Sequence, residues 1–279
     1  MWQKSYADGP ILYLVPTPIG NMEDITYRAI KILNDVSVIF SEDTRQTAIL
    51  LNYYGIKSKL ICLEDHNENV IKEKVLNCLN EGENVAIVTD RGTPIISDPG
   101  YKTVNYVIDN GYNVVSLPGA TAFVPALTVS GLAPLPFVFY GFLNSRASKR
   151  KRELENLKNI EYSMIFYESP HRIIDVLSEM LDIFGDRNIS ISREISKKFE
   201  SVYRGTLSDV INNFDTVKGE FVIVVEGYNN KLDNNDIDYE EIVNNKIKEG
   251  YSISDAIKIV AKEYNISKNI LYKKYHGGK

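Results

Sequence analysis

Cysteine and histidine are scarce in this sequence of 279 residues, which has two cysteines and three histidines. Cys62, Cys78, His66, His171 and His276 are scattered along the chain without the spacing of a metal-ligand set, so no metal site is expected. Two cysteines also exclude a disulfide framework as the basis of the fold. Such a composition is typical of a reducing compartment, and we expect a cytoplasmic location.

Long apolar runs are missing as well. The longest are only as long as a strand, so no membrane-spanning helix is expected. The first ten residues, MWQKSYADGP, have no apolar core before their Gly-Pro pair, and we expect no signal peptide. The formal net charge is −5, so the chain as a whole does not attract nucleic acid, and the distribution of charge matters more than its sum.

The first half of the sequence alternates between strand-like and helix-like segments. Apolar runs predict strands at 11–15, 36–40, 59–63, 84–89 and 113–117. Helical spacing predicts a helix at 22–33 with Asn21 as N-cap, and another at 69–80 that stops at Gly82. The apolar runs are continuous, which is typical of strands buried on both faces. The pattern predicts an α/β fold with a mostly parallel, helix-covered sheet.

The second half predicts another α/β unit, with a more mixed strand order. Its elements are a small-residue helix at 120–132, strands at 137–142, 162–168, 188–193 and 219–226, and helices at 148–158, 170–184 and 208–214. We place the boundary near 117–119, between an N-terminal α/β domain, 1–117, and a C-terminal α/β domain, 118–228.

The end of the chain predicts a separate small unit. Residues 229–238, NNKLDNNDID, are polar and lack apolar periodicity, which indicates a linker. Beyond it we expect helices near 239–249, 254–264 and 267–275, the last with Ser267 as N-cap. Such an arrangement looks like a helix-turn-helix. This helical extension, 239–279, holds eight Lys against five Asp and Glu, a balance of +3.

Four loops rich in Gly, Pro, Thr and Asp follow predicted strands. They are VPTPIGN (15–21), SEDTR (41–45), DRGTPIISDPG (90–100) and LPGATA (117–122). Ligands of open α/β sheets bind beyond the carboxyl ends of the strands, so the four loops predict one shared site. The third loop lacks the Lys that a P-loop contains, and it lacks the glycine fingerprint of a dinucleotide-binding loop. With only Arg45 and Arg91 as cations, the loops favour a cationic or adenosine-bearing ligand over a bare phosphate.

Several segments resemble, in order, the motifs of a known family. They are LYLVPTPIGNMEDITYRAI, SEDTR, DHNE, DRGTPIISDPGY, LPGATA, FYESPHR, SRE and GEFVIVVEG, within residues 11–227. The chain resembles the small-subunit ribosomal RNA cytidine 2′-O-methyltransferases of the tetrapyrrole methylase superfamily. The resemblance implies two α/β domains with S-adenosylmethionine in the cleft between them, and a homodimer. It also implies methylation of a cytidine ribose in the decoding region of 16S ribosomal RNA, either naked or within the assembled 30S subunit.

The resemblance also implies a set of cofactor-binding residues. They are Pro16, Thr17, Asp90, Gly92, Thr93, Ile95, Pro118, Gly119, Thr121 and Ala122. Two positions depart from the family pattern. Arg91 replaces an Ala, and a cation beside a sulfonium is unfavourable unless it points away, toward RNA phosphate or an acidic partner. LPGATA replaces LPGPSA, but Thr121 keeps a hydroxyl.

A ribose 2′-hydroxyl is a poor nucleophile, and a proton acceptor helps its in-line attack. Our candidate catalytic residues are His66, Glu68 and Glu168. Further acidic or histidine candidates are Glu42, Asp43, His171 and Glu194. Each has a structural alternative, such as Glu168 holding Arg172 at i,i+4. The sequence leaves the acceptor open, and positioning alone is a further alternative.

Cations are expected to contact RNA phosphates, the usual source of RNA affinity. The candidates are Arg45, Arg150, Lys151, Arg152, Arg172 and Arg193. A solvated helix start explains the basic stretch 146–152 equally well. The basic helical extension is expected either to contact RNA or to serve in packing or dimerisation.

Two other functions stay open. One is a methyltransferase of the same superfamily that acts on a small macrocycle, an enzyme that would not need the basic segments. The other is a non-catalytic RNA-binding assembly factor, which Arg91 keeps open.

Overall fold

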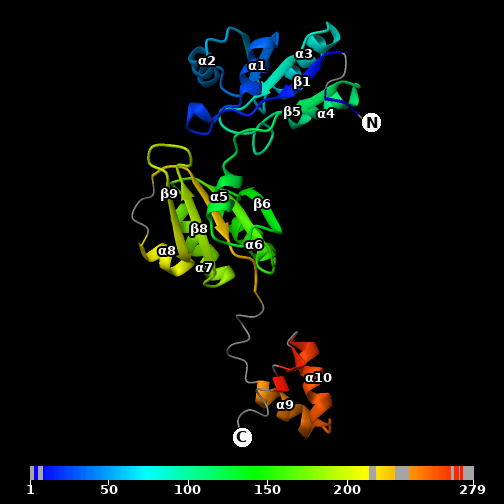
Figure 1. Cartoon of the computed structure of the whole chain (residues 1–279), viewed down its shortest axis with the longest axis vertical. Coiled ribbons are helices and arrows are strands. Elements are labelled where there is room, and N and C mark those ends of the chain that lie inside the picture. The colour runs from blue at the N-terminus through cyan, green and yellow to red at the C-terminus, as the bar shows by residue number, and fades with distance from the viewer. Residues whose placement is uncertain are drawn as a thin grey trace. The chain divides into compact units, whose positions relative to one another are not determined.

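The structure is a computed structural model that describes residues 3–5, 9–213, 218–229, 239–264, 267–269 and 271–272. The chain divides into two compact units, Met1–Tyr228 and Asn229–Lys279. Figure 1 labels their elements along the chain. All of the predicted linker except its first residue lies outside the described residues. Every helix in the described part of the chain is too short or too polar to cross a membrane.

A parallel sheet of five strands, in the order β3-β2-β4-β1-β5, builds the first half of the first unit. Its strands are β1 (Ile11–Leu14), β2 (Val38–Ser41), β3 (Lys59–Cys62), β4 (Val85–Val88) and β5 (Asn113–Ser116). Helices α1 (Tyr27–Asp35) and α2 (Thr44–Tyr53) cover one face, and α3 (Glu68–Asn80) and α4 (Tyr101–Asp109) cover the other. Strands β2 and β4 are buried throughout, as their continuous apolar runs predict. The predicted helix-covered parallel sheet is therefore confirmed.

The helix predicted at 22–33 is two elements. Asn21 caps a short 3₁₀ turn, η1 (Met22–Asp24), by accepting a hydrogen bond from the Glu23 N–H (3.1 Å). Helix α1 begins only at Tyr27, where the Thr26 hydroxyl accepts from the Ala29 N–H (3.1 Å). Thr26 has an extended backbone, so one helix does not run through it.

The second sheet has the order β6-β7-β10-β8-β9, with β6 parallel to β7 and the other pairs antiparallel. Its strands are β6 (Phe137–Phe142), β7 (Ser163–Glu168), β8 (Asn188–Arg193), β9 (Ser201–Thr206) and β10 (Phe221–Val225). Helices α6 (Ala147–Leu157), α7 (Ile173–Phe184) and α8 (Leu207–Asn213) pack on one face, and α5 (Phe123–Val129) packs on the other. The mixed strand order is as predicted. The sequence analysis did not identify the edge strand β9, and it gave no bounds for the helices α2 and α4 that alternate with the strands of the first sheet.

Arg150 is buried, so the prediction that it contacts RNA is wrong. Arg150, Leu154 and Leu157 form the inner face of α6. The Arg150 side chain is 5% exposed, and its Nε and Nη2 donate to the two carboxylate oxygens of Glu179 on α7 at 2.6 and 2.9 Å. Lys151 and Arg152 follow on the exposed side of the same helix. The basic stretch therefore contains one structural cation among exposed ones.

The second unit has its own small core. Helices α9 (Tyr239–Lys248) and α10 (Ile253–Glu263) bury apolar side chains against each other and against Leu271. Ser252 caps α10 by accepting from the Asp255 N–H (3.2 Å). Of the predicted third helix, 267–275, residues 268, 269, 271 and 272 are helical, and much of the rest lies outside the described residues.

Candidate active site

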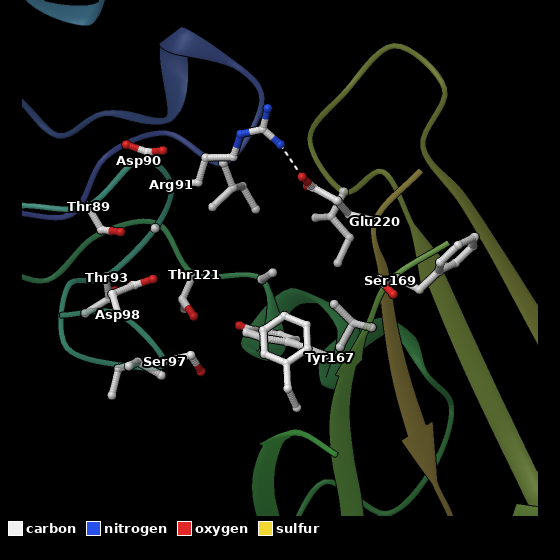
Figure 2. A pocket seen from close by; sticks show the side chains of 18 of the residues that line it. Thr89, Asp90, Arg91, Thr93, Ser97, Asp98, Thr121, Tyr167, Ser169 and Glu220 are labelled. Carbon is white, nitrogen blue, oxygen red and sulfur yellow. Dashed lines mark hydrogen bonds and ion pairs between the residues drawn. The ribbon is translucent and has the colours of Figure 1, made fainter. Parts of the chain in front are cut away.

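A cavity of about 570 Å³ lies between loops of the first sheet and one end of the second (Figure 2). The first sheet contributes Ile19, Glu42, Asp43, Gln46, Thr89, Asp90, Arg91, Gly92, Thr93, Ile96, Ser97 and Asp98, followed by Thr121 and Ala122 before α5. The second sheet contributes Phe142, Tyr167, Glu168, Ser169, Pro170, Ile195, Glu220, Phe221 and Val222. The volume is in the usual range for a small-molecule site.

Hydrogen bonds join the first, third and fourth predicted loops at the edge of this cavity. Thr17 and Gly92 exchange two backbone hydrogen bonds, of 2.9 and 3.0 Å. The Thr93 hydroxyl donates to the Ala120 carbonyl oxygen (3.0 Å). Gly92 has a φ of +85°, in the left-handed region that favours glycine, and a Cβ here would lie 3.4 Å from Ile19. The three loops therefore form one connected rim.

The second loop completes the rim and brings carboxylates together. The Asp43 N–H donates to Asp90 Oδ1 (3.0 Å), and the Thr89 hydroxyl donates to Glu42 Oε2 (2.8 Å). Asp98 also lines the cavity, near Glu42 and Asp90. We call Glu42, Asp90 and Asp98 the acidic wall. No Lys or Arg among the described residues forms an ion pair with any of the three.

The pKa values of Asp98 and Asp90 respond to burial and to like charge. Burial first, and then the neighbouring Glu42 and Asp90 carboxylates, raise the pKa of Asp98 to about 6. Burial is also the main cause that raises the pKa of Asp90, although the Asp43 N–H opposes it. The wall is a region of negative potential that suits a cationic ligand.

The opposite wall is aromatic. The rings of Phe142 and Tyr167 meet edge to face with 5.5 Å between their centroids, and Phe139 packs against Tyr167 at 5.0 Å. Phe142 is 54% exposed although it lines the cavity. Exposed aromatic faces of this kind can stack on a planar ligand group. We call Phe142 and Tyr167 the aromatic wall.

Arg91 connects the two sides of the cavity. Its Nη1 donates to Glu220 Oε1, and Figure 2 shows the side chain reaching Glu220 at the edge of the cavity. The Lys197 ammonium bonds the other oxygen of Glu220 (2.8 Å) and also Glu194 (2.9 Å). Arg91 therefore has an acidic partner, which is one of the two directions that the sequence analysis left open for it.

The implied cofactor-binding residues fall into two groups. Asp90, Gly92, Thr93, Thr121 and Ala122 line the cavity. The others, Pro16, Thr17, Ile95, Pro118 and Gly119, are outside the lining and shape the loops behind it. A Cβ on Gly119 would come within 2.6 Å of Pro16, so the first and fourth loops touch here. Ile95 is partly buried and packs against the core of the first sheet.

The three candidate catalytic residues have structural partners. Glu168 lines the cavity, but its side chain is buried and accepts from the Ser169 N–H (2.7 Å) and from Arg172 (3.1 Å), the predicted structural alternative. Glu68 is buried outside the lining and accepts from the Thr103 N–H (3.0 Å) in the first turn of α4. His66 is exposed beside Glu64, also outside the lining.

The candidate RNA-binding cations differ in whether their side chains are already bonded to other protein groups. The Arg45 side chain is 88% exposed, but its guanidinium donates hydrogen bonds to both carboxylate oxygens of Asp43. These bonds lower the pKa of that carboxyl to about 2. Arg172 donates to the Leu143 carbonyl oxygen (2.9 Å), and Arg193 donates to the Lys218 carbonyl oxygen (2.5 Å). These arginines hold loops near the cavity, whereas Lys151 and Arg152 lie exposed on α6.

Sequence reasoning missed four notable lining residues: Asp98, Phe142, Tyr167 and Glu220. Asp98 and Tyr167 stand inside the quoted motifs DRGTPIISDPGY and FYESPHR, and Glu220 begins the strand motif GEFVIVVEG after its glycine. A carboxylate in a Gly/Pro loop after a strand was the available signal for Asp98. No sequence signal indicated the aromatic pair, because Phe142 and Tyr167 lie on two different strands, β6 and β7, that become neighbours only when the chain folds.

Comparisons with known proteins agree with this geometry. The family model described as "Tetrapyrrole (Corrin/Porphyrin) Methylases" matches residues 11–211. "Ribosomal RNA small subunit methyltransferase I" of Bacillus subtilis is 46% identical over 278 residues, which are 97% of this chain and 95% of that protein. The protein of the same name from Halalkalibacterium halodurans is 42% identical over 98% of both chains. A Thermus thermophilus uroporphyrin-III C-methyltransferase, solved with S-adenyl homocysteine, covers 78% of this chain and 97% of its own at 18% identity, with a TM-score of 0.57, which shows a shared fold.

Proposed function

Because the chain belongs to the tetrapyrrole methylase family, we propose that it transfers a methyl group from S-adenosylmethionine to the ribosomal RNA of the small subunit. Relatives that carry this function in their names match the chain over nearly its full length at 46% and 42% identity. The finer proposal is that the acceptor is the 2′-oxygen of a cytidine ribose in the decoding region. An RNA substrate is favoured over a small macrocycle by those names and by the exposed basic residues of α6.

The acidic wall is the observation that carries the proposal. S-adenosylmethionine supplies an electrophilic methyl group on a positively charged sulfonium, and it also carries an ammonium group. Glu42, Asp90 and Asp98 line the cavity without a Lys or Arg partner among the described residues, so a cationic ligand would offset their mutual repulsion. The proposed ligands of the methyl donor are Asp90, Thr121 and the backbone of Gly92 and Thr93.

The rest of the cavity offers means to orient the acceptor. Phe142 and Tyr167 present ring surfaces on which a planar group can stack. Ile19, Ile195 and Val222 add apolar surface that excludes water from the reacting atoms. The exposed Lys151 and Arg152 would contact RNA phosphates outside the cavity.

Arg91 no longer favours a non-catalytic role. A free cation beside the methyl donor would oppose binding of the donor, but the Arg91 guanidinium is paired with Glu220, which Lys197 also holds. The local charge is therefore compatible with a sulfonium. The homodimer, the cytoplasmic location and the choice between naked RNA and assembled subunit stay predictions.

Mass mapping of ribose methyl groups tests the proposal. Small-subunit RNA that lacks the modification, naked or as assembled subunits, is incubated with the protein and S-adenosylmethionine and then digested. We expect one new methyl group on a cytidine ribose, dependent on the methyl donor and reduced with the Asp90→Ala variant at a subsaturating donor concentration. Donor binding without transfer to either form of RNA would contradict the proposal and favour a small-molecule substrate. RNA binding without donor binding would favour an assembly factor.

A further inference from the structure

We propose that the Phe142 ring stacks on the base of the nucleotide that receives the methyl group, so that this nucleotide is unstacked from its neighbours when it binds. This inference rests on the proposed function and deepens it, because it names the side chain that positions the acceptor. It is carried by a β-bulge in β6, by the exposure of the ring and by the cations that follow it along the chain.

A β-bulge directs Phe142 into the cavity. Successive side chains of a strand point to opposite faces, so Val138, Tyr140 and Phe142 would share one face of a regular strand. Val138 and Tyr140 do pack against the core that the second sheet forms with α6, α7 and α8. The pairing of β6 with β7 shifts between Phe139 and Gly141, which makes Tyr140 the extra residue. Phe142 therefore turns to the other face of the sheet, where it lines the cavity.

The strand pairing and the backbone agree with this change of face. Phe142 lies opposite Tyr167 on β7, and Tyr167 packs against the core on the α5 side of the sheet. Gly141 has a φ of +82°, in the left-handed region that favours glycine, and a Cβ here would lie 3.6 Å from the Ser97 hydroxyl oxygen. Bulges are common beside active sites, where they redirect a side chain. This bulge brings an aromatic ring to the cavity that a regular strand would place under the helices.

The ring of Phe142 is held by one contact and is otherwise accessible. Phe123, Phe139, Tyr167 and Phe142 form a series in which each ring contacts the next. Among the described residues, Phe142 has a ring contact with Tyr167 alone, edge to face with 5.5 Å between centroids, and it remains 54% exposed. An exposed aromatic ring can stack on any base, once that base has left its neighbours in the RNA.

The chain after Phe142 leads directly to exposed cations. Strand β6 ends at Phe142, and α6 begins at Ala147. The exposed cations around the start of α6 are Arg146, Lys149, Lys151 and Arg152. None of the four forms an ion pair among the described residues. An aromatic ring followed by unpaired cations suits a single strand of RNA, because the ring takes a base and the cations take phosphates.

The segment between the ring and these cations is fixed in place. Leu143 is buried, and its carbonyl oxygen accepts from Arg172 (2.9 Å). The Asn144 N–H donates to the Glu153 carboxylate on α6 (2.8 Å). The ring and the start of α6 therefore keep a defined relation, and little order has to be imposed on them when RNA binds.

The adenine of the methyl donor is the other planar group that a ring in this cavity could take. Three of the proposed donor ligands, Asp90, Gly92 and Thr93, lie in the loop after β4, and Figure 2 shows Asp90 and Thr93 across the cavity from Tyr167. Phe142 lies on an edge strand of the second sheet. The cations that follow it are of no use to a positively charged donor, whereas RNA requires them. The observations therefore favour the base of the acceptor.

A cycle that combines a change in the protein with a change in the RNA tests the stacking. One RNA is intact, and in the other the methylated nucleotide, located by mass mapping, keeps its ribose but lacks its base. Binding of both to the wild type and to Phe142→Ala is measured by fluorescence anisotropy with saturating S-adenosylhomocysteine, so that no transfer occurs. We expect the loss of the ring or of the base to weaken binding by about 5–150-fold. The loss of both should weaken it no more than either loss alone.

Three further variants identify the nature of the contact. Phe142→Tyr keeps the ring and should bind both RNAs within a few-fold of wild type. Phe142→Leu keeps apolar volume without a ring and should resemble Phe142→Ala. Tyr162→Ala is the matched control, because Tyr162 is 47% exposed and precedes β7 at the end of that strand away from the cavity. It should bind both RNAs as the wild type does.

The outcomes separate the inference from the proposed function. Wild-type affinity of Phe142→Ala or Phe142→Leu for the intact RNA overturns the inference. Effects of the missing ring and the missing base that multiply also overturn it, because the ring then acts on another part of the RNA. Weaker calorimetric binding of S-adenosylhomocysteine to Phe142→Ala without RNA would place the ring on the adenine of the donor. Methyl transfer by the wild type establishes the proposed function in each of these cases, and no transfer by the wild type removes both.

Discussion

Two regions of the first unit gather charged side chains, and they balance the charge in opposite ways. Behind the second sheet, Arg150 on α6 meets Glu179 on α7 in a two-point ion pair. In the cavity, Glu42, Asp90 and Asp98 stand together, and none of them forms an ion pair with a Lys or Arg among the described residues. The first arrangement neutralises its charge internally, whereas the second leaves a negative potential facing an open volume.

The difference indicates which charges hold the fold and which hold a ligand. A buried, paired charge is costly to break because its partner is left alone in a poor solvent. A group of like charges lowers stability, and such groups persist where binding or catalysis requires them. Arg150 looked like an RNA contact in the sequence but has a structural role, while Asp98, which the sequence analysis passed over, has the environment of a functional group.

Breaking the ion pair should give the largest effect. Arg150→Ala leaves Glu179 buried and unpaired, and we expect a loss of about 3–5 kcal/mol in the free energy of unfolding. Arg152→Ala, on the exposed side of the same helix, should change it by no more than about 0.5 kcal/mol. Urea unfolding of both variants measures the contrast. Equal effects would contradict the distinction between structural and exposed cations in α6.

Removing a carboxylate from the acidic wall should affect binding more than folding. Asp90→Ala removes a charged partner for the methyl donor, and we expect its affinity to fall by about 10–100-fold, the equivalent of about 1.5–3 kcal/mol. Calorimetric titration with S-adenosylmethionine measures the affinity, and Asp109→Ala provides an exposed control on α4. Unchanged affinity of a folded Asp90→Ala protein would place the methyl donor elsewhere.

Neutralising Asp98 should stabilise the protein. Because its pKa is raised from 3.8 to about 6 in the folded state, the folded protein keeps this proton over a pH range in which the unfolded chain loses it. The stability from this group is present below 3.8 and is lost as the pH rises through about 6. Asp98 is only half-buried, so we expect Asp98→Asn to gain about 1 kcal/mol at neutral pH, or about 2–4 °C in Tm.

Thermal unfolding across pH measures this gain. It should shrink as the pH is lowered toward 3.8, where both states hold the proton. A gain that is independent of pH would mean that the ionised carboxylate is not its source.

Breaking the contact between Arg91 and Glu220 should have the smallest effect. Arg91 and Glu220 are largely exposed, and such pairs contribute about 0.2–1 kcal/mol. A double-mutant cycle with Arg91→Ala and Glu220→Ala should return a coupling energy in that range, which weakens at high salt. A much larger coupling would make this pair a structural element comparable with Arg150 and Glu179.

The sequence predicted the scaffold better than the chemistry. Continuous apolar runs such as VAIV identify strands buried on both faces, and loops such as DRGTPIISDPG identify the strand ends where a site forms. The partners of charged residues depend on contacts between distant segments. Arg150 and Glu179 are 29 residues apart, and Arg91 and Glu220 are 129 apart, so local spacing does not reveal either pair.

Local signals were available for some of the errors. Arg150, Leu154 and Leu157 follow the i, i+4, i+7 spacing of one helix face, which indicates that Arg150 points inward. The edge strand β9, SVYRGT, has few apolar residues because much of it remains accessible, and its pattern is weak. Thr26 is a second N-cap signal after Asn21, and it marks the real start of α1.

The structure of the protein in complex with S-adenosylhomocysteine tests the central claim most directly. We predict that the ligand occupies the cavity between the acidic and aromatic walls, in contact with Asp90 and with the backbone of Gly92 and Thr93, while Arg91 remains paired with Glu220. A ligand bound at another surface, with this cavity empty, would contradict the account.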